Sequence, residues 1–120
     1  MSTVLSLTLV GCGGEQRAKP VDVELARATL TQVLDHWKSG GAIADLRTQS
    51  PEIVVQEAFW SNGETLQEYA LIGEPRAEDG NWFCEVELTL ASDNGGEPTR
   101  KTVTYAVGTD PVLTVFRAML

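Results

Sequence analysis

The sequence has few of the residue types that build metal and nucleophilic centres. It contains one histidine and only two cysteines, which lie far apart at positions 12 and 84. One imidazole and two separated thiols cannot supply the ligand set of a zinc site. We therefore expect no metal and no cofactor, we identify no catalytic residue, and a protein without enzymatic activity is favoured while an enzyme stays the alternative.

Basic residues are also scarce. Nine Lys and Arg stand against 17 Asp and Glu, which gives a net charge of −8. This balance argues against nucleic acid as a partner, because phosphate binding needs clustered cations, and against adsorption to an anionic lipid surface. The acidic residues are spread along the chain, which is typical of a solvated surface; a dedicated site for a cation or a basic partner is the alternative.

Long hydrophobic runs are missing, but a short one opens the chain. Residues 1–11 carry no charge and are rich in Val and Leu. At about 1.5 Å per residue this stretch is too short for a bilayer core of roughly 30 Å, but it suits the apolar region of a secretory signal. An N-terminal strand over Val4–Val10 is the alternative, because Val and Leu loosely alternate there with Ser and Thr.

The run ends in Leu9-Val10-Gly11-Cys12, which resembles the lipobox of bacterial lipoproteins. The resemblance implies cleavage before Cys12 and a diacylglyceryl group on its thiol, so that the chain would be attached to the membrane through this lipid. The start Met1-Ser2-Thr3 departs from the pattern, because signals usually begin with Lys or Arg. A start site assigned too far downstream would explain the departure.

The residues after Cys12 predict a tether and then a single domain. Residues 13–20 are polar and glycine-containing and would reach about 15 Å. We therefore divide the chain into a signal peptide (1–11), a lipidated cysteine with a flexible tether (12–20) and one domain (21–120). The resemblance implies the cell envelope, and Gly13 in place of Asp favours the periplasmic face of the outer membrane by the sorting rule of Gram-negative lipoproteins.

The domain begins with an amphipathic helix. Residues 21–38 place apolar side chains on one arc at helical spacing, and Asp22 is suited to be the N-cap. Gly40-Gly41 supplies the stop, and residues 43–47 predict a short second helix. The apolar arc contains Val23, Ala26, Leu30, Val33, Leu34 and Trp37.

From Glu52 onward the apolar spacing changes to two, which predicts strands. The expected strands cover residues 53–60, 66–76, 82–90, 100–107 and 112–118. With Asn94-Gly95 as a hairpin turn, Cys84 opposes Tyr105 and Leu88 opposes Lys101. The turn at Asp79-Gly80 would place Tyr69 opposite Leu90 and Leu71 opposite Leu88, with Pro75 at an edge or a bulge.

One helix followed by four or five antiparallel strands predicts an α+β fold, with the helix packed on a curved sheet. This element order, together with the helix end at Trp37-Lys38-Ser39-Gly40, resembles the cystatin-like and NTF2-like folds. The chain lacks the Gln-x-Val-x-Gly loop of cystatins, so inhibition of proteases by that loop is not expected.

The predicted ligand surface is aromatic. Trp60, Trp82 and Tyr105 would line the inner side or open end of the sheet, where they either contact a small apolar ligand or fill the core. His36 is interpreted as a surface histidine and Cys84 as a buried free thiol. The leading hypothesis is a non-catalytic binding or scaffold domain, with an envelope protein or a small apolar ligand as partner. The alternatives are an NTF2-like enzyme or carrier that uses the concave face, and a subunit of an envelope complex.

Overall fold

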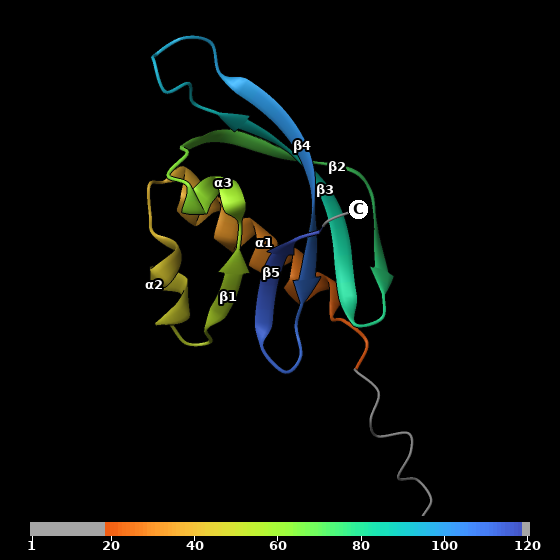
Figure 1. Cartoon of the computed structure of the whole chain (residues 1–120). Coiled ribbons are helices and arrows are strands. Elements are labelled where there is room, and N and C mark those ends of the chain that lie inside the picture. The colour runs from red at the N-terminus through yellow and green to blue at the C-terminus, as the bar shows by residue number, and fades with distance from the viewer. Residues whose placement is uncertain (1–18, 119–120) are drawn as a thin grey trace, which may run out of the picture.

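The computed structural model describes residues 19–118, which form one curved sheet around a long helix (Figure 1). The predicted signal segment 1–11 and Cys12 lie outside the described residues. Helix α1 covers Val23–Lys38 and is followed by α2, Ile43–Arg47. The strands are β1 (Ile53–Gln56), β2 (Leu66–Glu78), β3 (Asn81–Leu90), β4 (Thr99–Gly108) and β5 (Leu113–Arg117), and the short helix α3 (Ala58–Ser61) lies between β1 and β2.

Helix α1 forms as predicted and packs its apolar face against the sheet. The carboxylate of Asp22 accepts a hydrogen bond from the backbone N–H of Leu25, which caps the helix. Val23 was predicted to lie on the buried arc, and this prediction was wrong, because Val23 is 42% exposed in the first turn. Thr29, which was not among the predicted residues, is buried. The remaining five residues of the apolar arc are buried in the core: Ala26, Leu30, Val33, Leu34 and Trp37.

The sheet is mixed, so the prediction of a purely antiparallel sheet was wrong. Its order is β1-β5-β4-β3-β2, and β1 pairs with β5 in parallel, with Ile53 beside Leu113. No hairpin joins β1 to β2. Instead, α3 carries the chain to the far edge of the sheet, which leaves β1 to pair with the last strand. The α+β class and the packing of the N-terminal helix on one face of the sheet are confirmed.

The β3–β4 pairing is the one predicted, since Cys84 opposes Tyr105 and Leu88 opposes Lys101. The predicted β2–β3 register was wrong by two residues: Tyr69 faces Leu88, and Leu71 faces Val86. The cause is an irregularity between Ile72 and Arg76, which contains Pro75 on the edge strand. A shift of two preserves the faces, so the same side chains still point to the core.

The predicted strand over residues 53–60 was also wrong beyond Gln56. Glu57 stops the strand because its carboxylate accepts hydrogen bonds from the backbone N–H groups of Phe59 and Trp60, and this caps α3. The α3 turn places Trp60 over the end of α1, where its ring stacks on Trp37 with centroids 5.4 Å apart and planes 9° apart. Trp60 thereby joins the core.

Candidate functional site

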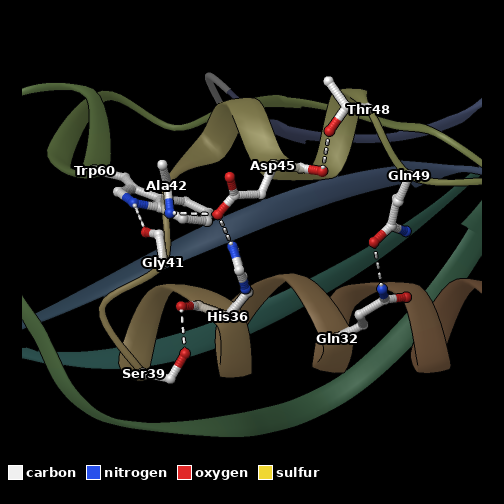
Figure 2. Close-up of polar contacts among 9 residues, drawn as sticks. All are labelled: Gln32, His36, Ser39, Gly41, Ala42, Asp45, Thr48, Gln49 and Trp60. Carbon is white, nitrogen blue, oxygen red and sulfur yellow. Dashed lines mark hydrogen bonds and ion pairs between the residues drawn. The ribbon is translucent and has the colours of Figure 1, made fainter.

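A large recess lies on the outer side of α1, between this helix and α2, and it is called here the α1–α2 groove. Its volume is about 930 Å³. Helix α1 supplies one wall, and α2 together with Gln49, two residues beyond its end, supplies the other (Figure 2). Most of the residues that line it have polar side chains, although their carbon atoms supply the larger part of the surface; the polar residues include Arg27, Thr31, Gln32, Asp35, His36 and Gln49.

A histidine–carboxylate pair closes one end of the groove. Nε2 of His36 lies 2.8 Å from Oδ2 of Asp45 and donates a hydrogen bond to it. The same oxygen accepts the backbone N–H of Ala42 at 3.1 Å, so Asp45 also fixes the start of α2. Both hydrogen bonds stabilise the ionised carboxylate, the His36 bond more strongly, and they lower the pKa of Asp45 below its usual 3.8.

The His36 ring is held between two neighbours. It lies against Gly41, where a Cβ atom would overlap the ring, and its centroid is 6.2 Å from that of Trp60. The side chain is 29% exposed. His36 thus lies at the surface of α1, as predicted, but it is partly buried and joins two helices, which the prediction did not include. Its partner lies on another helix, which the spacing of residues along α1 could not indicate.

Side-chain amides bridge the groove further along. Nε2 of Gln32 on α1 donates to Oε1 of Gln49 at 3.2 Å, and Gln49 also donates to the carbonyl of Pro51 (Figure 2 shows the first of these bonds). On the side of the sheet, the hydroxyl of Tyr69 donates to Asp35 at 2.6 Å. Burial first and this hydrogen bond second raise the pKa of Tyr69 to about 12.

The chemistry of the groove is that of hydrogen bonding. Ser39, His36 and Asp45 have the residue types of a catalytic triad, but the Ser39 hydroxyl donates to the backbone carbonyl of His36 rather than to its ring. The imidazole therefore does not activate this hydroxyl as a nucleophile. What the groove presents is a row of amide, hydroxyl and charged groups held in place by contacts between α1, α2 and β2.

The three predicted ligand residues are brought onto the core side of the fold, but they do not surround one cavity. Tyr105 is 0% exposed and Trp82 is 2% exposed, with the guanidinium of Arg27 5.2 Å above the Trp82 ring. Trp60 is 9% exposed and borders a separate recess of about 260 Å³ with Trp37. Side chains of the core thus fill the concavity of the sheet.

Sequence reasoning missed a buried ionic cluster beneath α3. Glu57 is 3% exposed, and its carboxylate accepts hydrogen bonds from the Tyr105 hydroxyl and from Arg117, whose Nε lies 2.9 Å away. A second Arg117 nitrogen lies 3.1 Å from the other carboxylate oxygen. Burial, and next the negative charge of Glu57, raise the pKa of Tyr105 far above its usual value. An acidic residue inside the apolar run 53–60 was the available signal.

Cys84 is a buried free thiol, as predicted. It is 1% exposed, and burial raises its pKa, which disfavours the thiolate needed for nucleophilic chemistry. Within residues 19–118, no group of three or more His, Cys, Asp and Glu side chains is arranged to hold a metal ion. In the same part of the chain, no helix combines the length and the apolar character needed to cross a membrane.

Comparisons with protein-family models, with curated proteins and with solved structures found no match to this chain.

Proposed function

We propose that this chain is a lipoprotein of the bacterial cell envelope, held by a lipid on Cys12, and that its domain binds a partner protein through the α1–α2 groove without catalysing a reaction. The anchor is supported by the sequence Leu9-Val10-Gly11-Cys12 and by the polar residues that follow it. Cys84 is buried, so Cys12 is the thiol available for lipid attachment.

The observation that carries the binding proposal is the placement of the recess. Core side chains occupy the concave face of the sheet, whereas the α1–α2 groove is open to solvent and offers both apolar surface and polar side-chain groups. Gln32 and Gln49 carry amide groups that both donate and accept hydrogen bonds, and such groups complement the backbone of an extended polypeptide. The favoured ligand is therefore an extended segment of another envelope protein.

The finer fold assignment is part of this proposal. A curved sheet of five strands around an N-terminal helix is consistent with the NTF2-like or cystatin-like arrangement. A second candidate function, binding of a small apolar ligand, is favoured by the 260 Å³ recess beside Trp37 and Trp60. Saturable shifts of the Trp37 indole N–H signal in NMR spectra on addition of toluene, lost in a Trp60→Leu variant, would support this second function.

Photo-crosslinking in living cells tests the groove. A benzophenone amino acid is placed at Thr31, in the groove, or at Thr102, an exposed position on the outer face of the sheet. We expect a discrete cross-linked protein from Thr31 alone, and its loss in the Cys12→Ala chain. Equal cross-linking from both positions, or none from Thr31, would contradict a binding role for the groove.

A further inference from the structure

The exposed large apolar side chains of residues 19–118 are Val23, Leu25 and Val112, which are 42%, 41% and 39% exposed. Leu25 and Val112 are called here the tether-end patch. Val23 and Leu25 belong to the first turn of α1, and Val112 belongs to the loop between β4 and β5. Leu25 and Val112 line one recess of about 400 Å³, together with Pro51.

The patch lies where the described chain begins. The backbone N–H of Asp22 donates to the Thr109 hydroxyl at 3.1 Å, which fastens the residue before α1 to the end of β4. Figure 1 shows the start of α1, the β4–β5 loop and the connection from α2 to β1 at one end of the domain. The hairpin loop between β3 and β4 lies at the opposite end.

This placement decides what covers the patch. If Cys12 carries a lipid, the eight residues 13–20 hold this end of the domain at an average distance of about 15 Å from the membrane. A tethered surface needs little affinity of its own, because the tether supplies a high local concentration. Apolar side chains at the lipid–water interface also leave water, which favours contact.

The charges near the patch select the kind of lipid. Asp22, Glu24 and Asp110 are exposed carboxylates at this end, and Glu52, which borders the recess, is paired with Arg47 at 3.1 Å. Negative charge disfavours approach to an anionic surface. A surface of zwitterionic headgroups therefore fits the patch better than one rich in anionic lipids.

From these observations we infer that the tether-end patch rests on the zwitterionic lipid surface to which the chain is anchored, so that the domain stands with a fixed orientation and the β3–β4 hairpin points away from the membrane. This inference rests on the proposed lipid anchor at Cys12. It goes beyond the anchor because a flexible tether alone would leave the domain free to rotate.

Spin labels at the two ends of the domain test this orientation. The full chain is expressed in a bacterial host as Val112→Cys or, as the matched control at the opposite end, Asn94→Cys. The lipidated protein is then placed in phosphatidylcholine vesicles. Cys84 is buried, so the label enters at the introduced cysteine. The measurement is the collision rate of each label with a water-soluble nickel chelate and with oxygen, which concentrates in lipid.

We expect shielding of the Val112 label from nickel by about fivefold or more relative to the Asn94 label, and a higher oxygen collision rate. Replacing half of the lipid by phosphatidylglycerol should reduce this shielding. So should Leu25→Asp, whereas Ala70→Asp, which adds the same charge at an exposed position on β2, should not. These results together would support the inference.

Three outcomes would overturn it. Equal water exposure of both labels on a lipidated chain would contradict the orientation while leaving the anchor intact. Absence of lipid on Cys12 would remove the anchor and, with it, the basis of the inference. Shielding of the Val112 label that persists in the soluble Cys12→Ala protein would identify a protein occupant: a second copy if it depends on concentration, or the chain's own residues 1–11 if it does not.

Discussion

The imidazole of His36 and the carboxylate of Asp45 lie 2.8 Å apart and join α1 to α2 across a loop that contains Gly40 and Gly41. This pair fixes the position of α2 at one end of the α1–α2 groove. The contact matters there because α2 is a short helix that buries a single side chain, Leu46, in the core. A change that separates the two side chains should therefore alter the groove without unfolding the sheet.

The His36–Asp45 pair should make the unfolding free energy of the domain depend on pH in the acid range. Because the pKa of Asp45 is lowered in the folded chain, its contribution is present above the ordinary value of 3.8 and is lost as the pH falls through the lower folded value. We expect Asp45→Asn to remove this part of the acid dependence. Thermal unfolding of both proteins between about pH 2 and pH 5 measures it. If the unfolding temperatures of the two proteins changed with pH in the same way, the His36–Asp45 pair would not contribute to the acid dependence.

Gly41→Ala should disrupt the same contact by a steric route. The added Cβ would overlap the His36 ring, which must then move away from Asp45. Overpacking of this kind costs about 1–3 kcal/mol of unfolding free energy. In a His36→Ala background the overlap disappears, so the cost of Gly41→Ala should fall to near zero. Equal costs in the two backgrounds, measured by urea unfolding, would rule out the steric explanation.

Glu57 should be the ionisable residue whose loss costs most. Glu57→Gln leaves the Arg117 guanidinium without its buried partner and weakens the bond from Tyr105, at a cost of about 3 kcal/mol of unfolding free energy. Adding Arg117→Met should restore part of the loss, because an uncompensated buried charge is then removed. Urea unfolding of the single and double variants measures this. A double variant less stable than Glu57→Gln would contradict the interpretation.

The two tyrosines should ionise at distinct and high pH. In Tyr105→Phe, only Tyr69 remains, and its absorbance titration should centre near pH 12 rather than at its ordinary pKa of 10.0. Asp35→Asn should bring the midpoint part of the way back, because it removes the negative charge beside the hydroxyl while the burial stays. A midpoint near 10 in folded Tyr105→Phe would show that Tyr69 is not held in this environment.

Local patterns in the sequence predicted much of this fold, and contacts between distant residues account for the rest. The β3–β4 register was predictable because alternation and one hairpin turn determine which residues meet, as with Cys84 and Tyr105. The end of β1 was not, because Glu57 caps α3 while Arg117 and Tyr105, far along the chain, hold its carboxylate. The parallel β1–β5 pair likewise depends on where α3 sends the chain.

The groove was beyond sequence reasoning for a related reason. The facing of His36 and Asp45 depends on the angle at which α2 leaves the loop after α1, and no periodicity encodes that angle. The aromatic residues chosen as a ligand surface are explained by the opposite effect. Trp82 and Tyr105 point to the inner face as their alternation predicts, but the core there is filled, so they pack instead of lining a cavity.

Intact mass spectrometry of the protein purified from bacterial membranes tests the central claim most directly. The account predicts a chain that begins at Cys12, with residues 1–11 removed and a diacylglyceryl group on the Cys12 thiol, whereas the Cys12→Ala chain keeps its N-terminus and gains no lipid. Recovery of the unmodified chain with residues 1–11 still attached, from the soluble fraction, would contradict the lipoprotein assignment.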